Sequence, residues 1–435
     1  MSLAVLRNVD MESLSAKPTL LERLSFSICK RFLKAIKKGE LTLSLPNGDQ
    51  LKYGNPHSGR NADIQIHSYS LFWRIVKDGN IGLGEGFIEN NWSSSDLPNL
   101  IAFFLDNLEL NSERKLNLIL PVRLINKIWH RRRANSIKGA KANIHAHYDL
   151  SNDFFSKLLD KTMTYSSAYF TTPEEPLEVA QRNKLRLIAD KALINSSDHV
   201  LEIGSGWGSF AINTAKERGC KVTTLTISEE QFRYVKSRIK EEGLEGQVEV
   251  VLKDYRLVEG KFDKIVSIEM MEAIGKEYLG KFIECCEKLL RPDGIAVLQV
   301  ITMIDYWYEE YCKRCDWIQK YIFPGSHLPS LTHLSKEISN NSKLIIEGLE
   351  NIAPHYAKTL ATWRNTLHQI KSDLPKMGFD ERFFRIFDYY LASCEAEFGS
   401  RWLNVLQIVL TRPNNQRLLD NDNKRLNVSK LSVAA

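Results

Sequence analysis

The segment 198–214, DHVLEIGSGWGSFAINT, constrains the fold of this chain more than any other stretch. A short apolar run leads into a turn with GxGxG spacing, and apolar residues at helical spacing follow. This order predicts a strand, a glycine-rich turn and a helix. Glycines permit positive φ angles and let a ligand approach the backbone closely, and the free N–H groups at a helix start attract acceptors. Such a turn is either a ligand site or a plain structural joint. Its glycines are Gly204, Gly206 and Gly208.

Strand and helix patterns alternate after this turn, up to the strand IAVLQVIT at 295–302. A helix predicted over 176–192 precedes the turn. The βαβ rhythm predicts an α/β fold with a doubly wound, mainly parallel sheet, whose ligands bind beyond the carboxyl ends of the strands. Residues 226–228, 254–256 and 269–272 are expected at that edge. From Met303 an aromatic segment and long helical stretches to Thr411 are expected.

The chain divides by composition into four parts. Residues 1–111 are expected to form a smaller N-terminal α+β domain, with a helix, a hairpin turn at 46–48, a strand over 64–76 and a glycine-punctuated segment. A basic linker over 112–142 follows, then a catalytic domain over 143–411 and a flexible tail over 412–435. A chain of 435 residues is long enough for such an arrangement.

The linker is strongly basic and periodically apolar. Leucines and isoleucines recur at helical spacing, so one face would be apolar and the other cationic. Such a helix either lies on an anionic membrane surface, tracks nucleic acid phosphates, or packs as a solvated interdomain helix. Its only acid is Glu113, against Arg114, Lys115, Arg123, Lys127, Arg131, Arg132, Arg133, Lys138 and Lys141.

Composition points to the cytoplasm. No uncharged apolar run approaches the roughly 18 residues of a membrane span, and the first residues hold no long apolar segment. The seven cysteines are scattered and odd in number, which fits reduced thiols. Cys312 and Cys315 form one CxxC without a second pair, so no metal site is predicted.

The GxGxG turn with the preceding Glu202 is similar to the first motif of S-adenosylmethionine-dependent methyltransferases. Together with HYDLSNDFF, YSSAYF, KYIFPG and LPS, it makes residues 20–411 resemble a cyclopropane-fatty-acyl-phospholipid synthase. The resemblance implies a seven-stranded Rossmann-like methyltransferase sheet. It also implies transfer of the methyl carbon of S-adenosylmethionine to a cis double bond of a phospholipid acyl chain, followed by ring closure. A homodimer that contacts the inner membrane surface peripherally is implied as well.

The resemblance also assigns the catalytic residues. A bicarbonate ion would be the base, oriented by Glu272 and held with Tyr356. Ser167 stands where the family has cysteine, and Gln299, two residues before the matching Ile301, stands where it has histidine. Glutamine donates a hydrogen bond but carries no charge, so ring closure is either intact or replaced by methylation alone. Glu272, if buried without an anion, could itself act as base. Cys394 also matches a family cysteine, although the reaction has no step for a thiolate and a buried structural role fits better.

The cofactor contacts follow from the same resemblance. Tyr165 and Ser166 match a lid over S-adenosylmethionine, and Thr226, Ser228 and Gln231 replace the acid that often binds the ribose. Asp254 is expected either at the adenine or as a helix cap. The full predicted set is Tyr165, Ser166, Glu202, Gly204, Gly206, Gly208, Thr226, Ser228, Gln231, Asp254 and Tyr255.

Three alternatives stay open from the sequence. An enzyme with the same fold and cofactor could leave a methyl or methylene branch instead of a ring. A nucleic-acid methyltransferase would explain Arg131 to Arg133, but no NPPY-like motif or pair of catalytic cysteines supports it. A lipid-binding protein with a decayed site would explain Ser167 and Gln299.

Overall fold

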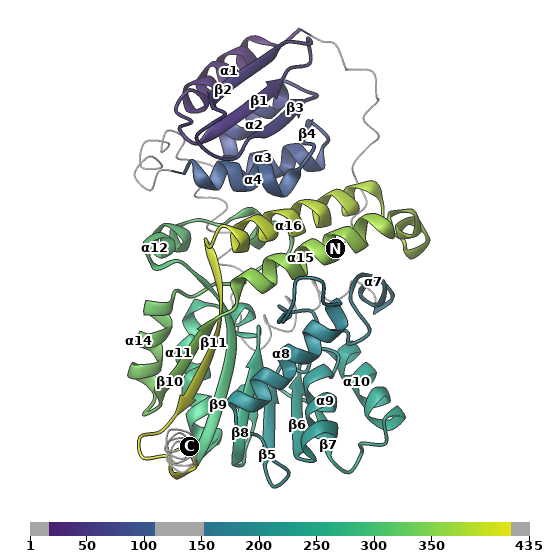
Figure 1. The fold of residues 1–435 in the computed structure, drawn as a ribbon, viewed down its shortest axis with the longest axis vertical. Coiled ribbons are helices and arrows are strands. Elements are labelled where there is room, and N and C mark those ends of the chain that lie inside the picture. The colour runs from purple at the N-terminus through teal and green to yellow at the C-terminus, as the bar shows by residue number, and fades with distance from the viewer. Residues whose placement is uncertain (1–16, 109–151, 419–435) are drawn as a thin grey trace, which may run out of the picture. The chain divides into compact units, whose positions relative to one another are not determined.

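The computed structural model describes residues 17–108 and 152–418, and the chain splits into two compact units (Figure 1). The described part of the first unit is residues 17–108 and 374–400, and that of the second is 152–373 and 401–418. The basic segment 112–142 and the start of HYDLSNDFF lie outside the described residues. Within the described residues, no helix combines the length and the apolar character needed to cross a membrane.

The second unit is built on a seven-stranded sheet in the order β10-β11-β9-β8-β5-β6-β7. Strands β5 to β9 are parallel to one another, whereas β11 runs antiparallel to both β9 and β10. This confirms the doubly wound, mainly parallel sheet. The strands are β5 (His199–Ile203), β6 (Lys221–Thr226), β7 (Val248–Leu252), β8 (Phe262–Ile268), β9 (Leu290–Met303), β10 (Ile345–Asn351) and β11 (Leu403–Thr411).

Helices cover both faces of this sheet, because successive strand residues point to opposite sides. Val200 and Val266 pack with α8 (Leu177–Lys191), α9 (Ser209–Arg218) and α10 (Glu229–Glu241). Leu201 and Ile265 pack on the other face with α11 (Leu279–Leu289) and α14 (Leu331–Asn341). The other helices of this unit are α7 (Asn152–Leu158), α12 (Asp305–Lys313), α13 (Trp317–Tyr321) and α15 (Ala353–Gln369), with 3₁₀ turns η2 (Tyr255–Leu257), η3 (Met271–Ala273) and η4 (Lys276–Tyr278); η5 (Lys371–Met377) crosses the unit boundary.

The first unit holds a four-stranded sheet in the order β2-β1-β3-β4. Its strands are β1 (Gly39–Ser44), β2 (Gln50–Asn55), β3 (Ala62–Ile66) and β4 (Trp92–Ser93), and its helices are α1 (Leu20–Leu33), α2 (Ser70–Asp78), α3 (Asn80–Ile88), α4 (Leu97–Asp106) and α16 (Glu381–Gly399). The predicted hairpin turn is confirmed, because β1 and β2 pair antiparallel across residues 46–48. Helix α16 is far from the rest in sequence, yet it packs on α3 and α4 within this unit.

Two local predictions were wrong. Residues 64–76 do not form one strand, because β3 ends at Ile66 and α2 begins at Ser70. The stretch up to Thr411 is not purely helical, since β10 and β11 complete the sheet. The glycine-punctuated segment, for which no element was predicted, contains α3, whose close packing needs small residues: a Cβ on Gly82 would lie 2.1 Å from the Arg74 carbonyl oxygen.

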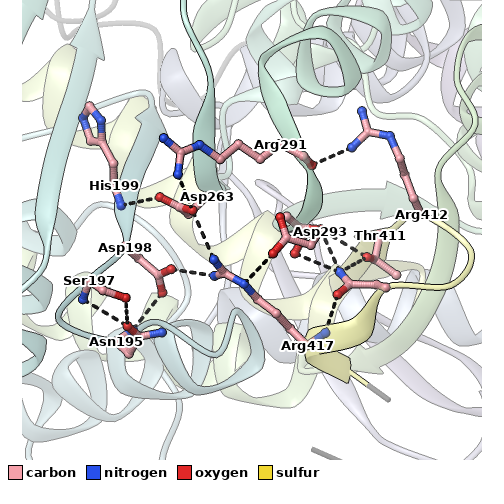
Figure 2. Close-up of polar contacts among 12 residues, drawn as sticks. Asn195, Ser197, Asp198, His199, Asp263, Arg291, Asp293, Thr411, Arg412 and Arg417 are labelled. Carbon is pink, nitrogen blue, oxygen red and sulfur yellow. Dashed lines mark hydrogen bonds and ion pairs between the residues drawn. The ribbon is translucent and has the colours of Figure 1, made fainter. Parts of the chain in front are cut away.

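The amino ends of the strands carry a dense ion network, which also holds the first residues after β11 (Figure 2). The Arg417 guanidinium donates to Asp198 at 2.7 Å, to Asp293 at 2.9 Å and to Asp263 at 3.2 Å. Arg291 donates to Asp263 as well, at 3.0 Å. The segment that we expected to begin a flexible tail is therefore tied to the sheet through Arg417.

Candidate functional site

The glycine turn has the predicted geometry. Gly204, Gly206 and Gly208 follow β5 with φ angles of 101°, 49° and 87°, which favour glycine. The N–H groups of Gly204 and Ser205 donate to the Leu225 carbonyl oxygen at 3.1 and 2.7 Å, so the turn is locked to the end of β6. A Cβ on Gly208 would lie 3.1 Å from Val235 on α10. The turn is thus rigid and closely packed.

A pocket opens at the carboxyl ends of β5, β6, β7 and β8, where the fold predicts a ligand. It brings together most of the predicted cofactor residues: Tyr165, Ser166, Glu202, Gly204, Gly206, Thr226, Gln231, Asp254 and Tyr255. Gly208 and Ser228 do not line it. The pocket is also lined by residues that the sequence did not single out, among them Lys184, Trp207, Lys253 and Glu269.

The β6 end carries a small polar network. The Thr226 hydroxyl donates to the Gln231 side-chain oxygen at 2.9 Å and accepts from the Ser228 N–H at 3.1 Å. Ser228 caps α10 by accepting from the Gln231 N–H at 3.3 Å. Thr226 and Gln231 therefore face the pocket, while Ser228 holds the helix start behind them.

The β7 end presents Asp254 and Tyr255. Asp254 caps η2 and accepts from the Arg256 guanidinium at 2.8 and 2.6 Å, so the cap and the pocket position coexist. Burial would raise the pKa of Asp254, but the Arg256 hydrogen bonds outweigh it and lower that pKa. The Tyr255 hydroxyl is buried without a hydrogen-bond partner, and burial raises its pKa. This hydroxyl can donate to a ligand.

The segment 162–170 covers the pocket and is anchored by α8. The Lys184 ammonium donates to the Ser166 hydroxyl at 2.8 Å, and the Gln181 amide donates to the Ser166 carbonyl oxygen at 2.9 Å. The Tyr165 ring packs between Phe155 and Trp363, with both centroid distances at 5.2 Å. These contacts hold Tyr165 and Ser166 in the pocket lining, and their role as a lid over the cofactor stays a prediction.

Three carboxylates are buried near Lys184. Burial raises the pKa of Glu202 to about 8, against the hydrogen bond that Thr224 donates at 2.6 Å and the Lys184 charge. Burial also raises the pKa of Glu269 and lowers that of Lys184 to about 8, while Glu269, Asp160 and Glu202 act the other way on the lysine. Several acids thus share one buried lysine.

Several of the predicted catalytic residues hydrogen-bond to the carboxylate of Glu269. The Ser167 N–H donates to its Oε1 at 2.9 Å, and the Gln299 amide donates to the same oxygen at 2.7 Å. A hydrogen bond from Tyr356 also acts on its carboxylate. The backbone of Glu269 has a φ of 49°, a left-handed conformation that side chains other than glycine rarely adopt.

Glu272 lies one turn away, outside the pocket lining. Its Oε1 accepts from the Ile301 N–H, and its Oε2 has no hydrogen-bond partner. Burial, and then the charge of Glu269, raises its pKa to about 8. The predicted residues Ser167, Gln299, Ile301, Tyr356 and Glu272 therefore cluster around two carboxylates. Cys394 is buried in α16, which belongs to the other unit.

The sequence missed Lys184 and the role of Glu269. A strand end at 268 marks the place of Glu269, but no local pattern shows what its side chain meets. Lys184 is on an ordinary helical pattern, and only its fully buried position in the structure distinguishes it from a surface lysine.

Comparison with known proteins places this site in a family. The family model described as mycolic acid cyclopropane synthetase matches residues 135–408. The tuberculostearic acid methyltransferase UfaA1 of Mycobacterium tuberculosis is 38% identical over 351 residues, which cover 79% of this chain and 81% of that protein. The cyclopropane-fatty-acyl-phospholipid synthase of Escherichia coli K12 is 33% identical over 363 residues, covering 81% and 88%.

A solved structure shares the fold. The crystal structure of mycolic acid cyclopropane synthase CmaA1 complexed with SAH and CTAB has a TM-score of 0.59 and 30% identity. The match covers 62% of this chain and 98% of that one.

Proposed function

Because this chain belongs to the mycolic acid cyclopropane synthetase family, we propose that it makes cyclopropane rings in unsaturated phospholipid acyl chains. It would transfer the methyl carbon of S-adenosylmethionine to the cis double bond. The observation that carries this proposal is the pocket at the carboxyl ends of the strands, which joins the glycine turn to a cluster of buried carboxylates. S-adenosylmethionine supplies an activated methyl group when it is bound.

The pocket fits S-adenosylmethionine. The positive φ angles of Gly204 and Gly206 bring backbone to the pocket edge without a Cβ, and the orphaned Tyr255 hydroxyl offers a donor. Thr226 and Gln231 would hydrogen-bond to the ribose hydroxyls, where many methyltransferases have an acidic residue. Asp254 would lie beside the adenine. Glu202 would face the amino-acid end of the cofactor. These residues bind and orient; none of them needs to react.

The remaining pocket residues suit a reaction at an apolar double bond. An alkene is a weak nucleophile, so positioning in a dry site must supply much of the rate. Met163, Trp207, Ile268 and Met270 line the pocket with apolar surface. A positive charge that develops on the acyl chain is stabilised by the Tyr165 face and by nearby carboxylates.

A second product is favoured by one observation. The 38% identical relative is named a tuberculostearic acid methyltransferase, and Gln299 cannot titrate. The same site could therefore leave a methyl or methylene branch without closing a ring. A nucleic-acid substrate is a weaker candidate because the relatives are named for fatty-acid and phospholipid substrates. A decayed lipid-binding site is weaker because the pocket and its carboxylates are present.

The function is tested by incubating the purified full chain with S-adenosylmethionine and liposomes of cis-unsaturated phospholipid. Mass spectrometry and proton NMR then identify the acyl product. A gain of one CH₂ with cyclopropane signals supports ring closure, and the same gain with vinyl signals supports a methylene branch. Cofactor binding without any lipid product would contradict the proposal.

Peripheral contact with an anionic membrane, at the cytoplasmic face, belongs to the same proposal. Helix α1 exposes an apolar stripe beside Lys30 and Arg31 in its last turn, which suits the surface of such a bilayer. The stripe consists of Leu20, Leu21, Leu24, Ile28 and Phe32, exposed by 75%, 48%, 57%, 41% and 44%.

This contact can be broken by design. The double substitution Leu24→Glu and Ile28→Glu should weaken co-sedimentation with anionic vesicles by about tenfold or more, because burying each apolar side chain is worth about 1.5–3 kcal/mol. Val179→Glu on α8, which replaces an equally exposed apolar residue, is the control. Unchanged binding of the double variant would remove α1 from the membrane contact. A homodimer, which the family implies, is tested separately by light scattering without vesicles.

A further inference from the structure

The groups expected to hold a bicarbonate ion hold a carboxylate of the chain itself. The Ser167 N–H and the Gln299 amide both donate to Glu269, at 2.9 and 2.7 Å, and Tyr356 hydrogen-bonds to the same carboxylate. Gln299 is fixed in this orientation, because its side-chain oxygen accepts from the Gln407 amide at 2.9 Å and its backbone carbonyl accepts from the Glu269 N–H at 2.8 Å. The donors of the site are thus engaged.

A free bicarbonate ion does not fit beside them. Such an ion needs several hydrogen-bond donors, but those of Ser167, Gln299 and Tyr356 already meet Glu269. Oε2 of Glu272, which has no hydrogen-bond partner, is a carboxyl oxygen. The other oxygen of Glu272 already accepts from the Ile301 N–H. An anion next to the Glu269 carboxylate would meet like charge in a low dielectric.

We propose that the Glu269 carboxylate is the base of this enzyme and takes the place of the bicarbonate ion. The inference rests on the proposed function, since it names the group that completes the lipid reaction. Glu269 would be a catalytic residue, while Ser167, Gln299 and Tyr356 would be positioning residues that orient its carboxylate.

The proton transfer balances without any further reactant. When the methyl group joins one carbon of the double bond, a positive charge remains on the other carbon. Glu269 accepts a proton from the new methyl group, and the electron pair of that C–H bond forms the third bond of the ring. The proton stays on the Glu269 carboxyl group and passes to water before the next turnover. If the proton came from a neighbouring chain carbon, the same base would leave a methyl branch beside a double bond in the chain. A methylene branch would form if a hydride first moved to the charged carbon and the new methyl group then lost the proton.

Placement distinguishes Glu269 from Glu272. Glu269 lines the pocket and Glu272 does not, so only Glu269 can reach a substrate there without rearrangement. Glu269 also keeps its side chain at a φ of 49°, where glycine is the natural residue. Strained backbone of this kind persists where the surrounding structure enforces it, and it concentrates at active sites. Its donors Gln299 and Tyr356 are neutral, so they orient the carboxylate without neutralising it.

The test compares the full-length protein with two variants in carbon dioxide-free buffer, with and without added bicarbonate. The unchanged protein should turn over lipid equally in both, within twofold. Glu269→Gln should lose at least about a hundredfold in turnover, as expected for removal of a general base. Its affinity for S-adenosylhomocysteine, measured by calorimetry, should stay within threefold. Glu277→Gln, at an exposed carboxylate nearby, is the matched control and should behave like the unchanged protein.

Glu269→Gly is the sharper variant. It relieves the unfavourable φ, which offsets part of the stability lost with the side chain, and it frees the Ser167 and Gln299 donors. Bicarbonate or acetate should restore its turnover at least tenfold, whereas Glu269→Gln, whose amide still fills the site, should not respond. A merely structural glutamate would give no such rescue.

Two results would overturn the inference and can be told apart. If the unchanged protein makes product only with added bicarbonate, or if Glu269→Gln keeps more than a third of its turnover, the role of Glu269 is wrong while the proposed function stands. If the unchanged protein binds cofactor but makes no lipid product at any bicarbonate concentration, the proposed function fails and the inference with it.

Discussion

The two ends of the parallel strands bury acids in opposite ways. At the amino ends, the single guanidinium of Arg417 donates to Asp198, Asp263 and Asp293, and Arg291 adds a hydrogen bond to Asp263, as Figure 2 shows. At the carboxyl ends, the charges of Glu269, Asp160 and Glu202 act on one buried lysine, Lys184. The same strands therefore carry a neutralised network at one edge and an excess of acid at the other.

The pKa values follow this difference. Burial would raise the pKa of Asp263, but the His199 N–H, Arg291 and Arg417 outweigh it and lower that pKa. For Glu202 and Glu272 burial prevails, and it raises both pKa values to about 8. Buried acids without enough nearby positive charge are candidates for catalytic residues, whereas acids paired with arginine have a structural role. The amino end has one exception: the Lys264 ammonium is buried without a hydrogen-bond partner.

The largest effect is expected from removing the lysine at the carboxyl edge. Lys184→Met leaves its acids unneutralised and the Ser166 hydroxyl without its donor, so the free energy of unfolding should fall by about 3 kcal/mol. Urea denaturation at pH 7 measures it. Lys216→Met, which breaks the surface pair with Glu242, is the control and should cost below about 1 kcal/mol. If Lys184→Met lost no more unfolding free energy than the control, the carboxyl edge would not hold an excess of buried acids that depends on Lys184.

A smaller effect on stability is expected at the amino edge. Arg417→Met should cost about 2 kcal/mol, less than a fully buried partner, because its side chain is 33% exposed and solvent screens part of the interaction. Turnover should not change, since the network lies at the edge opposite the pocket. Arg233→Met, at a surface arginine paired with Glu229 and Glu230, is the control. If Arg417→Met lost turnover and kept its full stability, the amino edge would not have the purely structural role that we assign to it.

The smallest effect is a pH dependence at Glu272. The folded pKa of about 8 exceeds the ordinary value of 4.5, so between these pH values the folded protein holds the proton more tightly than the unfolded chain. Stability is therefore lost as pH rises through this window. Glu272→Gln cannot titrate, so its stability relative to the unchanged protein should improve between pH 5 and pH 8, and its turnover should fall less than that of Glu269→Gln. Parallel pH profiles of the two proteins would contradict the raised pKa.

The sequence predicted most of the residues that line the pocket, because they lie at the ends of parallel strands. Gly204 follows β5, Thr226 ends β6 and Asp254 lies two residues after β7, and parallel strands bring their ends to one edge. The strand β11 was missed because its mostly apolar sequence, LNVLQIVLT, has no period that separates a buried strand from a helix. Helix α2 was missed because its aromatic and β-branched residues favour strands locally, and tertiary packing overrides that preference.

The base side could not be predicted from local patterns. Ser167 and Glu269 are 102 residues apart, and only the folded chain shows that one donates to the other. The family resemblance named the donors but gave no sign that a side chain of the chain fills the position between them. Burial of Lys184 likewise depends on segments far from its helix.

The most direct test of the division between the two edges measures turnover and unfolding free energy for Glu269→Gln and Asp263→Asn. Both changes remove one carboxylate without changing its size. Glu269→Gln should lose turnover by at least about a hundredfold while its stability stays equal or rises. Asp263→Asn should lose about 2 kcal/mol of stability and keep its turnover within twofold. If Asp263→Asn lost turnover at full stability, or Glu269→Gln kept it, the account of the two edges would be wrong.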